Sequence, residues 1–444
     1  MEEILELLEK KRLHELREAL VALNPVDVAG FLNEVGKDEL LLIFRLLPKD
    51  FAAAVFTYLG EDLHLILAES ISNQEINDLI SRLFLDDAVD FLEELPANMV
   101  NGILAHADPA KRAAINAALR YPDYSAGSLM TIEFVYLFET MTAAEALAHI
   151  RKRGTDRETI YTCYVTSPQR ILTGAVSLRR ILLSKDDTLI SDLMTTPVIA
   201  VHTHDDQEEV AEKFREYDLI AMPVIDNEER IVGIITIDDI VDVIVAENTE
   251  DIEKMAALHP SESEYLKTNI WRLARNRIFW LLFLMISATL TGIVINRYQE
   301  LLKTMVMLAA FIPMLMDTGG NCGSQASTLI IRGMAVGEIE LANWLKVVWK
   351  ELRVSIVVGL VLASVNFLRI MLFVKDSCLR MNIVVTVTLF ITIVFAKLIG
   401  CLLPMVAKRM RLDPALMASP MLTTIVDVVA LTIYFSIASL LFGL

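Results

Sequence analysis

The sequence is poor in cysteine and in positive charge. Its 444 residues include 4 cysteines and no Cys-x-x-Cys pair, which excludes a disulfide scaffold. Lysine and arginine number 40 against 58 aspartate and glutamate, so the formal net charge is −18. Nucleic-acid binding needs a basic surface, and this balance argues against it. The chain is 54% hydrophobic with a mean hydropathy of +0.48, too apolar for a disordered or an ordinary soluble protein.

The charge is divided unevenly along the chain. Residues 270–444 contain 16 Lys/Arg and 8 Asp/Glu, so the preceding 269 residues carry a net charge of −26. The first part is therefore an acidic soluble region and the second an apolar, mildly basic one. Because the first 16 residues are charged throughout, we expect no secretory signal peptide.

Five stretches of the apolar part are long enough to cross a membrane as helices. The predicted spans are 278–296, 304–331, 354–374, 382–407 and 414–444. Ten basic residues lie at the side from which the first span starts, against five at the other side. Basic loops stay in the cytoplasm. We therefore predict a multi-pass protein of the cell membrane with a cytoplasmic N-terminal part and an extracytoplasmic C-terminus.

An acidic side chain lies inside the fifth predicted span. A charge at membrane depth is costly and marks a functional candidate. Asp427 lies about 20 Å along a helix that begins at Pro414, and Thr423 and Thr424 share its face. Carboxylate and hydroxyl oxygens suit a hard cation such as Mg²⁺ or Ca²⁺. The alternative is a buried ion pair between Asp427 and Lys397.

The second predicted span contains the run PMLMDTGGNCGSQAS, whose proline and three glycines predict a broken helix. Broken backbone at membrane depth is tolerated inside protein or along a water-filled path. We therefore predict that this segment lines a pore, with Pro313, Asp317, Gly320, Asn321, Gly323 and Gln325 as lining residues. The alternative is close helix packing, which small residues also permit.

The cytoplasmic part divides into two regions by pattern. Up to about residue 128, apolar residues recur at three and four spacings between prolines, which predicts a helical array with an acidic patch around Asp86 and Asp90. The alternative interpretation is that this acidic patch is only a solvent-exposed face of the helix. From residue 130, β-rich runs alternate with helical ones, and Met130-Thr131 recurs as Met194-Thr195.

This repeat resembles a tandem pair of CBS domains, which are β-α-β-β-α units that often sense adenine nucleotides. In that family a Gly-h-h-[Ser/Thr]-x-x-Asp stretch contacts a ribose. The second repeat has it as Gly233, Thr236 and Asp239, and the first has Arg180 in place of the aspartate. The resemblance implies at most one complete nucleotide site, with ATP as a candidate ligand.

An acid-rich helical connector, residues 238–264, then leads to the first span. With it, the whole chain resembles the MgtE family of magnesium channels or transporters. The run GGNCGSQ after Pro313 and the run DPALMASP…TTIVDVVALTIYF carry the resemblance together with the domain order. It implies a multidomain α-helical membrane protein that forms homodimers. The implied segments are an acidic helical-repeat N domain (1–128), two α/β CBS domains (129–192 and 193–246), a plug helix (247–270) and a five-helix transmembrane domain (271–444).

The resemblance also implies roles for single acids. Asp427 corresponds to the pore carboxylate and Asp413 to an acid at the cytoplasmic start of the last span. The remaining implied metal-binding acids lie in the N domain (Asp86, Asp90), the CBS domains (Asp206, Glu208, Asp218), the junction of CBS domain and plug (Asp239, Asp242) and the plug (Glu247, Glu250, Asp251). Asp239 is claimed by the nucleotide motif as well, and the sequence leaves both roles open.

The implied function is Mg²⁺ uptake under feedback by cytoplasmic Mg²⁺. With little metal, the acidic faces repel one another and separate. Bound metal bridges them and closes the pore. The alternatives are a transporter of Co²⁺, Mn²⁺ or Ca²⁺, a non-conducting magnesium sensor and a CBS-regulated intramembrane metalloprotease. The protease would need His-Glu-x-x-His in a span, and no span contains histidine. We therefore expect no enzyme.

Overall fold

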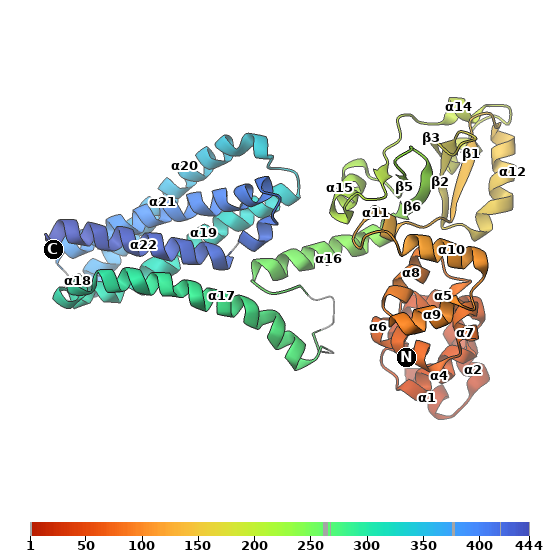
Figure 1. Cartoon of the computed structure of the whole chain (residues 1–444), viewed down its shortest axis with the longest axis horizontal. Coiled ribbons are helices and arrows are strands. Elements are labelled where there is room, and N and C mark those ends of the chain that lie inside the picture. Colours follow the sequence, from red (N-terminus) through yellow and green to blue (C-terminus); the bar gives the residue numbers. More distant parts are fainter. Residues whose placement is uncertain (1, 261–264, 267, 375–377, 418, 444) are drawn as a thin grey trace. The chain divides into compact units, whose positions relative to one another are not determined.

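The computed structural model describes residues 2–260, 265–266, 268–374, 378–417 and 419–443. The chain forms two compact units, Met1–Ile244 and Val245–Leu444. Helix α16 (Ile237–Met255) crosses the boundary between them (Figure 1). Each unit has buried apolar clusters of its own.

The first unit opens with short helices that share one hydrophobic core. Four of them begin at or directly after a proline, because proline fits the start of a helix: α3 at Pro25, α5 after Pro48, α9 after Pro96 and α10 at Pro109. The helices are α1 (Glu2–Glu9), α2 (Leu13–Val21), α3 (Pro25–Leu32), α4 (Lys37–Leu46), α5 (Lys49–Phe56), α6 (Glu61–Ser70), α7 (Asn73–Ile80), α8 (Leu85–Glu93), α9 (Ala97–Leu104) and α10 (Pro109–Ala118). This arrangement confirms the predicted helical N domain.

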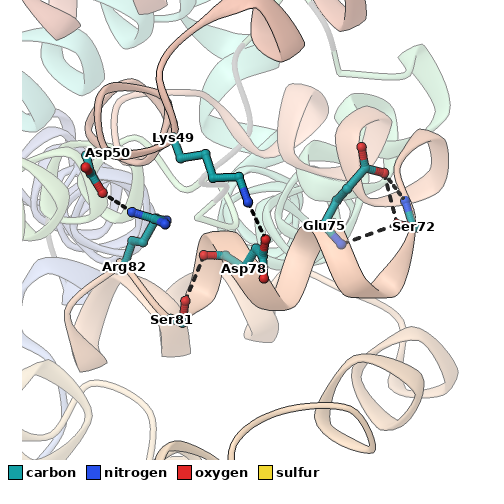
Figure 2. Close-up of polar contacts among 7 residues, drawn as sticks. All are labelled: Lys49, Asp50, Ser72, Glu75, Asp78, Ser81 and Arg82. Carbon is teal, nitrogen blue, oxygen red and sulfur yellow. Dashed lines mark hydrogen bonds and ion pairs between the residues drawn. The ribbon is translucent and has the colours of Figure 1, made fainter.

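Ion pairs on the surface connect α5 and α7 across this array (Figure 2). Lys49 Nζ lies 2.6 Å from Asp78 Oδ2, and Arg82 pairs with Asp50. Ser72 begins α7 with a capping box, in which its Oγ accepts from the Glu75 N–H and Glu75 Oε2 accepts from the Ser72 N–H at 2.9 Å. Exposed pairs contribute up to about 1 kcal/mol each, so the shared apolar core supplies most of the stability.

Two small three-stranded sheets follow, each formed by a β-α-β-β-α unit, which confirms the predicted CBS pair. Within each sheet the first pair of strands is parallel and the second antiparallel. The elements are α11 (Ala126–Leu129), β1 (Phe134–Phe138), α12 (Ala143–Arg153), η1 (Gly154–Asp156), β2 (Thr159–Thr166), β3 (Leu172–Ser177), α13 (Leu178–Leu182), α14 (Ile190–Leu193), β4 (Val201–His202), α15 (Gln207–Tyr217), β5 (Ala221–Ile225) and β6 (Ile231–Thr236), followed by α16.

The repeated residues of the two CBS units contact each other crosswise. Thr131 bridges to Ile234 of the second sheet, and Thr195 bridges to Ala175 of the first. A Cβ at Gly233 would lie 2.8 Å from the Thr131 carbonyl oxygen. The glycine is therefore needed because the leading segment of one repeat passes against the last strand of the other.

The second unit consists of long helices. Four described helical segments are long and apolar enough to cross a membrane: Ile270–Arg297, Leu341–Phe373, Leu379–Arg409 and Pro414–Phe442. They correspond to α17, α20 with the short turn before it, α21, and α22 with the short turn before it. Its elements are α17 (Ile270–Arg297), α18 (Gln299–Thr304), η2 (Val306–Phe311), α19 (Ile312–Ala335), η3 (Leu341–Asn343), α20 (Trp344–Phe373), α21 (Leu379–Arg409), η4 (Pro414–Met417) and α22 (Ser419–Phe442). The 24-residue α19 is long enough, at about 36 Å, but too polar to qualify by composition.

Helix α21 is the centre of this unit and packs against α19, α20 and α22. Its face toward them carries Leu389, Ile393 and Ala396, all buried. The backbones of α21 and α19 approach each other closely, since a Cβ built on Gly400 would lie 2.3 Å from the Gly323 carbonyl oxygen.

Candidate ion path and cation-binding clusters

Helix α19 carries polar side chains on one exposed face. Asp317, Asn321 and Gln325 follow one another at four-residue spacing, which places them on the same side of the helix. All three are exposed in the single chain. A polar face at membrane depth needs water or a protein partner. This face is therefore suited to line an aqueous path or to face another copy of the chain.

The prediction of a broken helix here is wrong. Residues 312–335 form one continuous helix, because Pro313 lies in its first turn, where proline is tolerated. The glycines lie on the opposite, buried face. A Cβ at Gly320 would lie 2.9 Å from the Thr423 methyl group, and one at Gly323 would lie 3.0 Å from a Leu422 methyl group. Gly320 and Gly323 thus permit close packing with α22, while the polar residues between them face outward.

The same contacts set the relative register of α19 and α22. Gly323 lies at Leu422, Gly320 at Thr423 and Gly319 at Val426, so the two helices run in opposite directions. If this register continues by one residue, Asp427 of α22 lies beside the turn of α19 that contains Asp317. Thr423 is part of this junction. Thr424 points to α17 instead, with its Oγ1 3.3 Å from Ser287 Oγ.

Asp427 is a half-buried carboxylate in α22. It lies eight residues after Ser419, or about 12 Å from the start of the helix. This is shallower than the 20 Å expected, because the chain from Pro414 forms the separate turn η4 before α22 begins. Lys397 is buried in α21, and no ion pair between it and Asp427 occurs in the described part of the chain. The alternative assignment as an Asp427–Lys397 pair is thus not what the structure has.

A second group of acids surrounds the C-terminal end of α16 within the second unit. Lys254 Nζ lies 2.6 Å from Glu250 Oε1 and 2.6 Å from Asp413 Oδ2. Asp413 also accepts from the Ala415 N–H at 2.8 Å and thereby caps η4. The pKa of Asp251 is raised to about 6, chiefly by burial and then by the charges of Asp413, Glu247 and Glu250, while Lys254 acts in the opposite direction. The charges of the predicted plug acids and of the predicted acid of the last span therefore act on one another. These acids are Glu247, Glu250, Asp251 and Asp413.

A third group lies within the first unit, where α8 meets the start of α16 and the start of β2. Asp86 is 9% exposed. Burial raises its pKa well above the ordinary value, and the charges of Asp239, Asp87 and Glu158 raise it further. Burial likewise raises the pKa of Asp87 and of Asp239 to about 6 and that of Glu158 to about 8. We call Asp86, Asp87, Glu158, Asp238 and Asp239 the N–CBS acid cluster.

The N–CBS acid cluster has little counter-charge. Lys111 lies 3.5 Å from Glu133, beside the cluster, and lowers the pKa of Asp87 against the effect of burial. One Glu158 carboxylate oxygen is fully buried and has no hydrogen-bond partner. A buried, unpaired carboxylate oxygen is costly unless water or a cation contacts it.

Other acids of the predicted patch have different surroundings. Asp90 lies on α8 with an exposed side chain, and it is close enough to Asp239 for the two negative charges to repel each other. Glu94 pairs with the buried His64, whose Nδ1 lies 2.6 Å from Glu94 Oε2. Asp242 is exposed on α16. The patch thus combines a structural ion pair with acids that face α16.

The predicted CBS acids do not form one group. Asp206 begins α15 and accepts from the Glu208 N–H at 2.9 Å, so these two are neighbours. Asp218 ends the same helix in the left-handed conformation. Twelve residues of helix separate Asp206 and Asp218, which is about 18 Å. A metal shared by all three within one chain is therefore excluded by the helix length.

The nucleotide motif is folded in the expected place at the end of β6. Thr236 Oγ1 donates to Asp239 Oδ2 at 2.8 Å. The same Asp239 lies in the N–CBS acid cluster. The structure thus connects the motif and the acid cluster through one carboxylate.

The donor chemistry of these groups fits Mg²⁺, which binds oxygen and usually keeps several of its waters. In the described residues no three His, Cys, Asp or Glu side chains converge as a ready-made metal cage. A mostly hydrated ion does not require such a cage, because its waters bridge to the carboxylates. Glu158 with its buried unpaired oxygen is the residue that most needs such a contact.

The predicted site residues include neither Glu158 nor Lys254, and they also leave out Asp87 and Asp238, which neighbour predicted acids in the sequence. Glu158 lies outside every acidic run and joins the N–CBS acid cluster only through the tertiary fold. Lys254 follows Glu250 by four residues, a spacing at which an acid and a lysine pair on one helix face, so its first contact was within reach of the sequence. Its contact with Asp413, 159 positions further on, was not.

Comparison with known sequences gives matches along the chain. The family described as divalent cation transporter, MgtE, matches residues 312–437. The MgtE intracellular N domain matches residues 23–124, and the CBS domain matches residues 190–246, the second repeat. The magnesium transporter MgtE of Thermus thermophilus is 35% identical over 432 residues, 96% of this chain and 95% of that protein. The magnesium transporter MgtE of Enterococcus faecalis is 32% identical over 452 residues, 98% of this chain and 96% of that protein.

Two solved structures are similar to about half of this chain. The soluble part of a magnesium transporter has a TM-score of 0.52 at 33% identity and covers 55% of this chain and 96% of that one. The cytosolic domain of the Mg²⁺ channel MgtE in complex with ATP has a TM-score of 0.52 at 34% identity and covers 54% of this chain and 98% of that one.

Proposed function

The chain belongs to the MgtE family of divalent cation transporters, and on that premise we propose that it moves Mg²⁺ across the cell membrane along the polar face of α19, with Asp427 as the carboxylate that recognises the ion. Because the family consists of transporters, the enzyme alternative is set aside. The observation that carries the proposal is the pairing of an exposed polar helix face with an acid of α22 at the same depth.

We propose that two copies face each other along Asp317, Asn321 and Gln325. A symmetric dimer would surround one central path with both polar faces and both Asp427 side chains. A mostly hydrated Mg²⁺ would then meet two carboxylates and amide oxygens, the ligand types that it prefers. Light scattering of the purified protein distinguishes this dimer from a monomer.

Growth of cells that lack their own magnesium uptake tests the function directly. We expect expression of this chain to restore growth at micromolar Mg²⁺. Competition of uptake by Co²⁺, Mn²⁺ and Ca²⁺ tests the alternative cargo. Restoration of Mn²⁺ or Ca²⁺ uptake without Mg²⁺ uptake would contradict the magnesium assignment.

We propose that the first unit is cytoplasmic and that the C-terminus is extracytoplasmic. The uneven distribution of basic residues supports this orientation. The contact of Lys254 with Asp413 also supports it, because it puts the end of α16 at the start of α22, about 36 Å of helix away from Phe442. Reporters fused at the two termini should therefore read opposite sides, and two cytoplasmic readings would contradict the five-span arrangement.

We propose that cytoplasmic Mg²⁺ closes the path by binding to the acid groups on and around α16. Carboxylates that are brought together without counter-ions repel, and a bound cation removes this cost. The ion then favours the closed arrangement by its higher affinity for it. The proposal assigns regulatory binding to the N–CBS acid cluster with Asp90 and Asp242, and to Glu247, Glu250, Asp251 and Asp413. Asp206 and Glu208 at the start of α15 would contact Mg²⁺ separately from Asp218 at its end.

The pH dependence of the N–CBS acid cluster tests this regulatory role. Raised pKa values mean that the folded contact binds protons more tightly than the separated one. Its stability is therefore complete below about pH 4 and is lost as the pH rises through 6 to 8. Without metal, we expect hydrogen-exchange protection of α8 to fall about 10- to 100-fold from pH 5 to pH 8 after correction for the intrinsic rate.

Millimolar Mg²⁺ should remove most of this loss, because it stabilises the ionised carboxylates. Glu158→Gln should flatten the metal-free profile, because the amide does not ionise. Helix α2, which lies in the same domain away from the cluster, is the internal control. Equal pH profiles of α8 with and without Mg²⁺ would show that the cluster is only a solvated face.

We also propose that the motif Gly233–Thr236–Asp239 binds the ribose of an adenine nucleotide, with ATP as the candidate. The ATP complex of the similar cytosolic domain supports this ligand. Since Asp239 belongs to the N–CBS acid cluster, nucleotide and Mg²⁺ should influence each other's binding. Calorimetric titration of ATP with and without Mg²⁺ measures this coupling, and loss of binding in Asp239→Ala is the expected result.

A further inference from the structure

Lys254 occupies an unusual position among the acids at the end of α16. Its ammonium nitrogen is 2.6 Å from a carboxylate oxygen of Glu250 on its own helix and 2.6 Å from one of Asp413 at the start of the last span. Its side chain is 20% exposed. Ordinary surface lysines of this unit differ, since Lys303 contacts only Glu300, three residues away, and is well exposed.

The bridge of Lys254 joins two carboxylates that would otherwise repel. Asp413 is held in place by its cap of η4, so the ammonium of α16 meets an ordered partner. Glu247 and Asp251 contribute further negative charge at the same place. Asp413, Glu247 and Glu250 act on Asp251 with negative charge against the positive charge of Lys254, so a divalent cation is still attracted there.

We infer that Lys254 is a built-in cation that holds the end of α16 against the start of the last span and so sets how much of that contact depends on Mg²⁺. A tethered ammonium neutralises part of the repulsion before any metal binds, so the α16–Asp413 contact forms partly in the absence of Mg²⁺. The metal then supplies the rest. Lys254 is thus a positioning residue for closure, and the inference rests on the proposed gating by cytoplasmic Mg²⁺.

The energetic consequence of removing the charge has a definite sign. In Lys254→Gln the Glu250 and Asp413 carboxylates lose the ammonium that joins them, so the metal-free contact opens more often. Mg²⁺ restores the contact, because it binds the uncovered carboxylates at least as strongly once a neighbouring positive charge is gone. Lys254→Arg keeps the charge and the reach and should behave as the parent chain.

Limited proteolysis of the full-length protein in detergent measures the contact without requiring transport. A glutamate-specific protease cleaves after Glu247 and Glu250 in α16, and none of the variants changes the residues on either side of these two bonds. Without metal, we expect Lys254→Gln to be cleaved there about tenfold faster than the parent chain. At 20 mM Mg²⁺ we expect equal, slow cleavage of both. Lys303→Gln is the matched control and should leave the metal-free rate unchanged.

Each outcome decides between distinct claims. Equal metal-free cleavage of the parent chain and Lys254→Gln overturns the inference and leaves Mg²⁺ gating intact, provided that Mg²⁺ protects both. Fast cleavage of Lys254→Gln that Mg²⁺ does not reverse also overturns it, because this would indicate damage to the fold. If Mg²⁺ protects none of the chains, the proposed gating fails. A double-mutant cycle of Lys254→Gln with Asp413→Asn adds a direct readout, since additive effects would contradict the bridge.

Discussion

Asp427→Ala should reduce Mg²⁺ uptake to the level of cells without the transporter, while the protein still inserts and folds. The carboxylate has no ion pair or hydrogen bond within the described residues, so its removal leaves no buried partner unsatisfied. Removing an unpaired acid from a membrane helix lowers the cost of burying that helix, so stability should not suffer. The loss would therefore report on the ion and not on the fold.

Asp427→Asn separates charge from shape. The amide keeps the volume and one oxygen, but it lacks the negative charge that attracts a divalent ion, with or without its bound waters. We expect uptake at least tenfold below the parent chain. Glu300→Gln is the matched control, because it makes the same change in an exposed carboxylate outside the apolar part of the helices. Normal uptake with both Asp427 variants would remove this residue from the ion path.

Gly400→Ala should destabilise the second unit strongly, and Gly292→Ala should not. A methyl group at Gly400 would lie 2.3 Å from the carbonyl oxygen of Gly323, which is backbone and is held by its own helix. The helices α19 and α21 would have to separate, and such overpacking costs about 3 kcal/mol or more. Around Gly292 in α17 nothing lies within 4 Å of an added Cβ. There alanine should be neutral or up to about 1 kcal/mol stabilising.

Thermal melting of the purified protein in detergent measures this difference. We expect Gly400→Ala to lower the melting temperature markedly or to prevent isolation of folded protein, whereas Gly292→Ala melts like the parent chain. Similar melting of the two variants would mean that α19 and α21 separate at little cost. The close backbone approach would then not be a requirement of the fold.

The acidic residues show how far local patterns reach. Asp86 and Asp90 belong to one helix, and their density alone indicated a functional face. What the pattern left open was whether they face water. The tertiary fold brings α8 against the start of α16 and adds Glu158, the residue before β2, and the resulting burial raises the pKa values of the group. Burial depends on contacts between distant segments, so no local spacing predicts it.

In helix α19, the local pattern predicts the wrong backbone structure. Its proline and glycines predict a broken helix, because both residue types weaken helices in isolation. In the folded unit Pro313 falls in the first turn, and the glycines fall where α21 and α22 approach most closely. Packing outweighs intrinsic preference in this case. The polar residues of the same run still lie together on one face, since four-residue spacing is a property of the helix itself.

By itself, the sequence determined the order of the parts: an acidic helical array, a CBS pair of β-α-β-β-α units and a group of long apolar helices. It did so because periodicity, proline placement and hydrophobic length act over short stretches of chain. Only the tertiary structure decided that Lys254 bridges Glu250 and Asp413, that Glu158 joins the N–CBS acid cluster and that Asp427 has no bond to Lys397. Lys254 and Asp413 are 159 positions apart in the sequence. Whether such distant residues interact depends on distances of a few ångströms, which only the packing of the helices sets.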